Sequence, residues 1–250
     1  MQLSIITICY NEAANIERTL QSVVNQTWQY FEWIVVDGGS TDGTLDILEK
    51  YKNRINILIT KNDNGIYNAM NKGIRLAKGE YIYFLNGGDY FYDNTTLDKI
   101  FSQTLTGDLI YGNIMVFDNN IDSHLLKMPA NITLEFLYHK TLPHQSTLTR
   151  KDVFEKIGLY DESLKIAADY DFTIKALTGF NCKIQYLDIT FAWYLPNGVS
   201  HNDANRNAEK EIVHRQYFNY IKRFIYRNKL VSKYFILKNH IGNYLLNRKK

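Results

Sequence analysis

The first hundred residues alternate between short apolar runs and amphipathic patterns of helical period. The apolar runs are nearly continuous and rich in β-branched and aromatic residues, as expected for strands buried on both faces. They cover residues 3–8, 31–36, 55–59 and 81–85. Between them, apolar residues recur at helical spacing in the segments 16–24, 45–51 and 69–77. This order predicts an α/β fold with a mostly parallel central sheet and helices on both faces.

The middle third of the chain has a less regular pattern. Apolar runs at 108–117 and 121–128 flank Asp118-Asn119-Asn120, a combination typical of a hairpin turn. The pattern then predicts a strand over 145–149, a helix from Lys151 to Ile157 that stops at Gly158, a helix from about Asp169, and a strand pair around 183–194.

Residues 205–250 differ from the rest of the chain in charge. They contain 12 Lys and Arg against two acidic residues, whereas residues 1–204 contain 17 basic and 24 acidic residues, so the net charge of +3 conceals two regions of opposite sign. We therefore predict one domain over residues 1–204, with halves at about 1–107 and 108–204, and a basic amphipathic helical tail over 205–250.

Three interpretations of the tail are open. It can pack on the domain as a helical pair, lie on an anionic membrane surface, or contact nucleic acid. We expect no nucleic-acid partner, because the acidic body of the protein would repel a phosphate backbone.

Composition narrows the class of protein. With 45% hydrophobic residues, 22% charged residues and three prolines, the 250-residue chain is typical of a globular protein. Cys9 and Cys182 have no metal-ligand spacing, which favours a reducing compartment. No apolar stretch reaches the roughly 18 residues of a membrane span. We expect a cytoplasmic protein, with attachment to the inner face of the plasma membrane as an additional hypothesis from the tail.

Polar clusters follow the four N-terminal strands, where a doubly wound sheet binds its ligand. The clusters are Thr7 to Glu12, Asp37 to Gly43, Asn62 to Gly65, and Asn86 to Asp89. Each cluster taken alone could merely cap the following helix. The glycines after Asp37 and before Asp89 would also let a ligand approach the backbone. The G-x-G-x-x-G, G-x-x-x-x-G-K-[ST] and G-x-S-x-G motifs are absent, which disfavours a dinucleotide oxidoreductase, an NTPase and a serine hydrolase.

Several motifs occur in order along the first 200 residues: SIITICYNE from Ser4, VVDGGSTDGT from Val35, DNGIYNAMNKG from Asp63, GEYI from Gly79, HQ at His144, FEKIGLYDE from Phe154 and ADYDF from Ala168. As a set they resemble the family 2 glycosyltransferases, which have the GT-A fold with its Rossmann-like sheet. The nearest branch builds bacterial exopolysaccharides such as colanic acid. The resemblance implies a hexosyltransferase-type enzyme that moves a sugar, with inversion, from a UDP- or GDP-sugar to an acceptor hydroxyl in cell-surface polysaccharide biosynthesis.

The resemblance also implies roles for individual residues on the donor side. The positions expected to bind the nucleotide-sugar are Thr7, Tyr10, Asn11, Glu12, Asp37, Asp63, Asn71, Lys72, Gly87 and Gly88. Asp89 matches the last acid of a D-x-D-like motif, which implies a single Mn²⁺ or Mg²⁺ ion bound with the donor diphosphate. Asn86, Gly87 and Gly88 precede Asp89 where many relatives have further acids, so a metal-free alternative, with Lys72 or helix N–H groups facing the diphosphate, remains open.

On the acceptor side, the resemblance places the general base at Asp169. Asp171 is the competing candidate, but two residues along a helix rotate a side chain by about 200°. His144, Asp171 and Trp193 are expected near the acceptor, and the turn at residues 197–200 resembles a closing loop. The resemblance implies a saccharide or a polyprenyl-linked saccharide as the acceptor. The alternative function is a catalytically silent nucleotide-sugar-binding or scaffolding subunit, suggested by the thinned acid motif.

Overall fold

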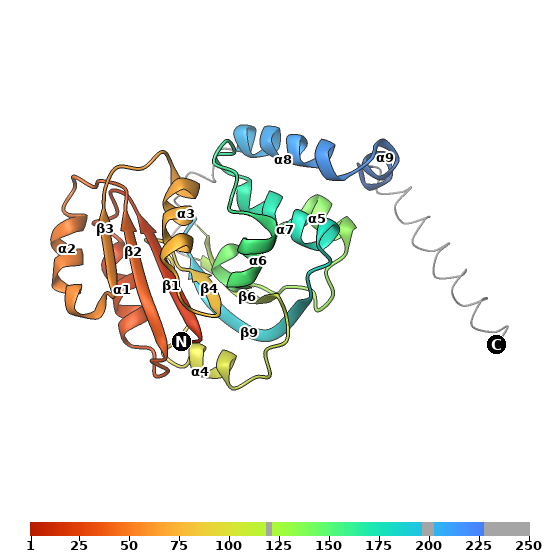
Figure 1. The fold of residues 1–250 in the computed structure, drawn as a ribbon. Coiled ribbons are helices and arrows are strands. Elements are labelled where there is room, and N and C mark those ends of the chain that lie inside the picture. The colour runs from red at the N-terminus through yellow and green to blue at the C-terminus, as the bar shows by residue number, and fades with distance from the viewer. Residues whose placement is uncertain (119–121, 197–202, 228–250) are drawn as a thin grey trace.

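The computed structural model describes residues 1–118, 122–196 and 203–227. Its strands form one sheet in the order β3-β2-β1-β4-β8-β6-β9-β5, with β7 beside β6 (Figure 1). The strands are β1 (Leu3–Cys9), β2 (Phe31–Asp37), β3 (Ile57–Thr60), β4 (Tyr81–Phe84), β5 (Tyr90–Phe91), β6 (Leu109–Asp118), β7 (Asp122–Leu126), β8 (Thr147–Arg150) and β9 (Ile184–Tyr194). The predicted α/β class is confirmed.

The helices lie on both faces of this sheet. They are α1 (Ile16–Val24), α2 (Thr44–Lys50), α3 (Ile66–Leu76), α4 (Thr96–Phe101), α5 (Leu134–His139), α6 (Lys151–Ile157), α7 (Ala168–Gly179), α8 (Asp203–Tyr217) and α9 (Tyr220–Arg227). Two short 3-10 turns, Lys52–Arg54 and His144–Ser146, complete the regular structure of the described residues.

The first four strands are parallel, as their apolar runs predict. Strand β1 pairs with β2 on one side and with β4 on the other, and β2 pairs with β3. In this register Cys9 lies opposite Asp37, and Asp37 lies opposite Thr60. The polar clusters that follow these strands therefore meet at one edge of the sheet.

The alternation of side chains along these strands divides the core into two layers. On one face, Ile6, Ile34 and Ile82 pack with residues of α3, α6 and α7. On the other face, Ile5, Val35 and Tyr83 pack with residues of α1, α2 and α4. Strands covered on both sides favour apolar residues on both faces, which explains their nearly continuous runs.

The second half of the sheet is mixed. Strand β8 is antiparallel to both β4 and β6, and β6 pairs with β7 in the antiparallel direction that the hairpin prediction requires. Asn119 and Asn120 of the predicted turn lie outside the described residues. The predicted strand pair around 183–194 is instead one long strand, β9, which runs parallel to β6 with register shifts near Asn113. Gly112 allows this irregular pairing, because a Cβ there would lie 2.4 Å from the Ile189 carbonyl oxygen. The sequence pattern did not predict the short elements β5, α4 and α5.

The first helix of the predicted tail packs against the domain. Helix α8 lies over α7 (Figure 1). Val213 in α8 and Phe218 directly after it are almost fully buried. The boundary between residues 204 and 205 stays a prediction, and residues 228–250 of the predicted tail lie outside the described residues. No helix in the described part of the chain combines the length and the hydropathy that a bilayer crossing requires.

Candidate functional site

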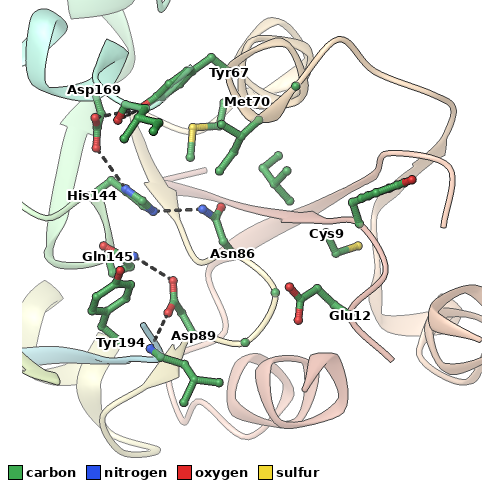
Figure 2. A pocket seen from close by; sticks show the side chains of 18 of the residues that line it. Cys9, Glu12, Tyr67, Met70, Asn86, Asp89, His144, Gln145, Asp169 and Tyr194 are labelled. Carbon is green, nitrogen blue, oxygen red and sulfur yellow. Dashed lines mark hydrogen bonds and ion pairs between the residues drawn. The ribbon is translucent and has the colours of Figure 1, made fainter. Parts of the chain in front are cut away.

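A cavity of about 330 Å³ opens at the carboxyl ends of the parallel strands. Both halves of the chain line it (Figure 2): the strand ends of the first half face the 3-10 turn His144–Ser146, the start of α7 and the end of β9. The predicted site residues in its lining are Tyr10, Glu12, Asp63, Gly87, Gly88, Asp89, His144 and Asp169. The cavity therefore brings together candidates for donor binding, metal binding, acceptor binding and catalysis.

The wall formed by β1 and the loop after β3 is suited to a flat ring. Tyr10 has 61% of its surface exposed, and Asp63 accepts a hydrogen bond from the Gly65 amide at 2.9 Å. Gly38 lies between these two side chains, because a Cβ at Gly38 would be 2.6 Å from Asp63 Oδ2 and 3.3 Å from Tyr10 Cδ2. The missing side chain lets the ring and the carboxylate lie close to the backbone at Gly38.

Asp89 is buried at the base of the cavity. Its Oδ2 accepts a hydrogen bond from Gln145 Nε2 at 3.0 Å, and its Oδ1 accepts one from the Leu195 amide at 3.1 Å (Figure 2). Burial raises the pKa of Asp89 to about 6 despite these donors. Burial also raises the pKa of nearby Glu12.

A hydrogen-bonded chain runs across the opposite wall. His144 Nδ1 lies 3.3 Å from Asp169 Oδ2, and His144 Nε2 lies 3.0 Å from Asn86 Nδ2 (Figure 2). If Asn86 donates to Nε2, then Nδ1 carries the proton and donates to Asp169. The Tyr67 hydroxyl lies 2.9 Å from Asp169 Oδ1. The Asp169 side chain is 19% exposed, so it is fixed from two sides and remains open to the cavity.

The other predicted donor-side residues lie outside the lining and bond within the protein. Thr7 Oγ1 accepts from Trp33 Nε1 at 3.1 Å, and Asn11 Oδ1 accepts from the Thr41 amide at 2.9 Å. Fully buried Asp37 accepts from the amides of Gly39 and Ser40 at 2.9 and 3.0 Å. These three side chains shape the loops that follow β1 and β2.

Two predicted residues of α3 also lie outside the lining. Asn71 donates to the Tyr160 carbonyl oxygen and to Glu162, and it accepts from the Tyr160 amide, so it joins α3 to the second half of the chain. Lys72 Nζ donates to the Asn62 carbonyl oxygen at 3.2 Å. In the described part of the chain, the lysine that lines the cavity is Lys165, which had no predicted role.

Two predicted acceptor-side residues lie away from the cavity. Asp171 faces α8, where it forms a hydrogen bond with Tyr217, and burial raises its pKa. Trp193 stacks with Phe117, with ring centroids 4.7 Å apart, and also with Tyr90 and Tyr92. Its neighbours Tyr194 and Leu195 line the cavity instead. The predicted closing turn at residues 197–200 falls outside the described residues.

The donor set at Asn86 and Asp89 suits a divalent ion that is shared with a substrate. Asn86 Oδ1 is buried without a hydrogen-bond partner, and carboxylate and amide oxygens are ligands that Mg²⁺ and Mn²⁺ accept. Among the described residues, however, no cluster of three His, Cys, Asp or Glu side chains could hold a metal. The residues present therefore fit an ion whose other ligands come from a diphosphate and water.

Several residues of the site had no role in the sequence prediction. They are Tyr67, Gln145 and Lys165, which line the cavity. Tyr67 and Gln145 lie within the motifs quoted above, which gave a weak signal, whereas Lys165 lies between two of these motifs. Their contacts are with residues distant in sequence, which the motifs do not reveal.

Comparisons with known proteins support a single family. The family model described as Glycosyl transferase family 2 matches residues 4–164. A Mycobacterium bovis protein named PGL/p-HBAD biosynthesis glycosyltransferase is 31% identical over 219 residues, which cover 85% of this chain and 82% of that protein. An uncharacterized glycosyltransferase of Rickettsia typhi is 32% identical over 189 residues, which cover 70% of this chain and 58% of that protein.

Two solved structures share the fold. TarS of S. aureus, in complex with UDP-GlcNAc, matches with a TM-score of 0.64 and 26% identity. The match covers 80% of this chain and 60% of the TarS chain. The mannosyltransferase PcManGT from Pyrobaculum calidifontis, in complex with GDP-Man and Mn²⁺, matches with a TM-score of 0.63 and 17% identity, covering 85% of this chain and 62% of that one.

Proposed function

Because the chain belongs to glycosyl transferase family 2 and is a glycosyltransferase, we propose that its cavity transfers a sugar from a nucleotide diphosphate to an acceptor hydroxyl with inversion. The observation that carries this proposal is the shared cavity. Tyr10 and Asp63 line it from the parallel half of the sheet, and Asp169 lines it from the start of α7. Donor and base candidates thus face one space that is large enough for a small-molecule substrate.

The nucleoside would lie against the wall formed by Tyr10, Asp63 and Gly38. A base ring can stack on an exposed tyrosine, and a carboxylate accepts the ring N–H of uracil or of guanine. Both UDP- and GDP-sugars occur in the related structures, so either base is compatible with the proposal. Five predicted donor-side residues bond within the protein and would then support this wall rather than touch the nucleotide. They are Thr7, Asn11, Asp37, Asn71 and Lys72.

The donor diphosphate would lie near Asp89 and Asn86. An Mn²⁺ or Mg²⁺ ion held there with the phosphates would offset the negative charge that grows on the leaving diphosphate. Gly87 and Gly88 allow the phosphates to approach the backbone, and Gly88 has a left-handed φ of 96°. Lys165, in the lining, is the cation we propose for the diphosphate in place of Lys72.

Asp169 would act as the general base. The acceptor oxygen forms a bond to the anomeric carbon while the bond from that carbon to the phosphate oxygen breaks, and the acceptor proton passes to Asp169. Tyr67 and His144 hold the carboxylate with one oxygen edge open to the cavity. His144 would also contact the acceptor, since it shares the lining with Asp169.

We propose a saccharide or polyprenyl-linked saccharide as the acceptor, in cell-surface glycan synthesis at the cytoplasmic face of the plasma membrane. The names of the mycobacterial relatives, which refer to PGL and p-HBAD biosynthesis, support a role in surface glycans. The basic tail supports the location, because each Lys or Arg near an anionic leaflet contributes about 1 kcal/mol.

The direct test is release of nucleoside diphosphate. Purified protein is incubated with UDP-GlcNAc, GDP-Man and other nucleotide-sugars, with and without Mn²⁺, and free UDP or GDP is measured. Slow hydrolysis of one donor that accelerates with a saccharide acceptor supports the proposal. Tight nucleotide-sugar binding without any release would instead indicate the silent binding subunit.

A further inference from the structure

The carboxylate of Glu209 on α8 binds the loop that leads into α7. Its Oε1 accepts a hydrogen bond from the Lys165 amide at 2.8 Å. Its Oε2 accepts from the amides of Ile166 and Ala167 at 2.8 and 2.9 Å. One side chain therefore satisfies three successive backbone donors, from a position more than 40 residues further along the chain.

This loop forms part of the cavity wall. Lys165 and Ile166 line the cavity, and Asp169 follows within the first turn of α7. From the other side, the Tyr67 hydroxyl lies 2.7 Å from the Ile166 carbonyl oxygen as well as 2.9 Å from Asp169. The loop is thus fixed between α3 and α8, directly before the proposed base.

Helix α7 lacks the local cap that would otherwise fix its start. Ala167 is the N-cap residue and has no side chain that could accept a hydrogen bond. The first N–H groups of a helix need acceptors from outside the helix, and a negative charge near them is favourable. Glu209 accepts from the amide of the N-cap residue Ala167 and brings a negative charge to the segment just before α7, so the geometry of this segment depends on the docking of α8.

The face of α8 that carries Glu209 is the one that packs on the domain. Val213 lies four residues later and is 1% exposed, and Tyr217 lies four residues after that and bonds with Asp171. Residues at this spacing share one helix face. Glu211, the other acidic residue of the tail, instead pairs with Arg215, Arg223 and Arg227.

We propose that Glu209 is a positioning residue of the transfer reaction: it holds loop 165–167 so that Asp169 faces the bound donor. This inference rests on the proposed function. Removal of the carboxylate leaves three backbone donors without their acceptor and frees the segment that sets the position of Asp169. Because a displacement of about 1 Å can lower a rate by about 10²-fold, the loss should affect turnover more than donor binding.

The experiment compares Glu209→Gln and Glu209→Ala with Glu211→Gln, a matched change on the same helix that does not touch the loop. The rate of UDP or GDP release is measured below the melting temperature with the best donor, and the Kd of UDP or GDP is measured by calorimetry. Val213→Ala serves as a stability control, because it loosens α8 packing without removing a hydrogen bond to the loop.

We expect Glu209→Ala to lower kcat by about 10²-fold with a nearly unchanged nucleotide Kd. Glu209→Gln keeps one acceptor oxygen and should lose less, whereas Glu211→Gln and Val213→Ala should keep near-normal kcat. Amide hydrogen exchange at residues 165–167 should accelerate in both Glu209 variants. If Glu209→Ala does not fold, the comparison of the two glutamine variants carries the test.

Two results would overturn the inference while leaving the proposed function intact. One is normal kcat in both Glu209 variants, even with a lower melting temperature. The other is an equal loss of kcat in Glu209→Gln and Glu211→Gln, which would indicate a general effect of the tail helices. A wild-type protein that releases nucleoside diphosphate from no donor would contradict the proposed function, and this inference with it.

Discussion

The hydroxyl of Tyr67 on α3 donates a hydrogen bond to Asp169 on α7 at 2.9 Å, across 102 residues of sequence. Burial and the nearby Asp169 carboxylate raise the pKa of Tyr67 well above its usual value, so the phenol stays neutral and remains a donor. This contact ties the two halves of the chain together at the cavity. It fixes Oδ1 of Asp169, whereas Oδ2 faces His144 and the cavity.

The first prediction concerns Asp169. Asp169→Asn keeps the size and the hydrogen bond from Tyr67 but removes the basicity, so transfer should fall by about 10²–10⁴-fold. Donor affinity should change little, because the base acts mainly in the transition state. Steady-state kinetics with nucleotide calorimetry checks both parts.

Asp171→Asn is the control for that experiment. Its side chain bonds with Tyr217 under α8 and lies outside the cavity lining, so turnover should stay close to that of the wild type. An inactive Asp171→Asn beside an active Asp169→Asn would reverse the assignment, and two active variants would place the base elsewhere.

The second prediction concerns metal-dependent binding at Asp89. Asp89→Asn should weaken the binding of UDP or GDP in the presence of Mn²⁺ and leave the free nucleoside unaffected, because an ion held by Asp89 would act on the phosphates and not on the base. With a pKa of about 6, wild-type Asp89 is ionised at pH 7.5 and largely protonated at pH 5. The Mn²⁺-dependent part of the affinity should therefore decrease at pH 5, as titration calorimetry at the two pH values can show. An unchanged diphosphate affinity in the variant would exclude Asp89 as a ligand.

The third prediction uses the same variant to measure stability. Because the folded-state pKa of Asp89 is about 6, above its usual 3.8, folding binds a proton, and the wild type loses stability as the pH rises from about 4 to about 6. Asn carries no charge and avoids this cost. The melting temperature of Asp89→Asn should exceed that of the wild type by several degrees at pH 7.5, with a smaller difference at pH 5. A difference that is independent of pH would show that Asp89 titrates normally.

The fourth prediction concerns the space at Gly38. Gly38→Ala places a Cβ 2.6 Å from Asp63 Oδ2, so either Asp63 or the backbone must shift. Gly38 does not have a positive φ, so the disturbance of the site would come from the close contact with Asp63 and not from backbone strain. Nucleoside affinity should fall at least tenfold, or about 1.4 kcal/mol. Gly179→Ala, where a Cβ would meet nothing within 4 Å, should bind normally; equal affinities would place the nucleoside elsewhere.

The fifth prediction concerns the basic tail. Deletion from residue 205 would remove buried Val213 and Phe218, so the useful truncation ends at Arg227. It removes six Lys or Arg and no acidic residue. Binding to vesicles with anionic lipid should be strong and salt-sensitive for the full chain and weaker for the truncation. Equal binding of the full chain to neutral and anionic vesicles would contradict a membrane role.

The parallel half of the sheet and the edge at which the site lies could be predicted from the amino-acid pattern alone. The runs that became β1, β2 and β4 are almost continuously apolar, because helices cover both faces, and this pattern needs no long-range information. The polar clusters after these strands had to meet, since parallel strands end at the same edge. The family could also be identified without long-range information, because its motifs are short segments in a fixed order.

Which polar residues face the cavity depends on how the chain folds, and the local pattern does not reveal it. Asp37 and Asp63 both follow strands, yet Asp37 bonds to its own loop while Asp63 lines the cavity. In the sequence, Glu209 is an acidic residue in a basic tail, and only the folded structure shows its contact with loop 165–167. Periodicity and capping are local properties of the chain, whereas the partner of a buried polar group is set by strand register and helix packing, which join residues far apart in sequence.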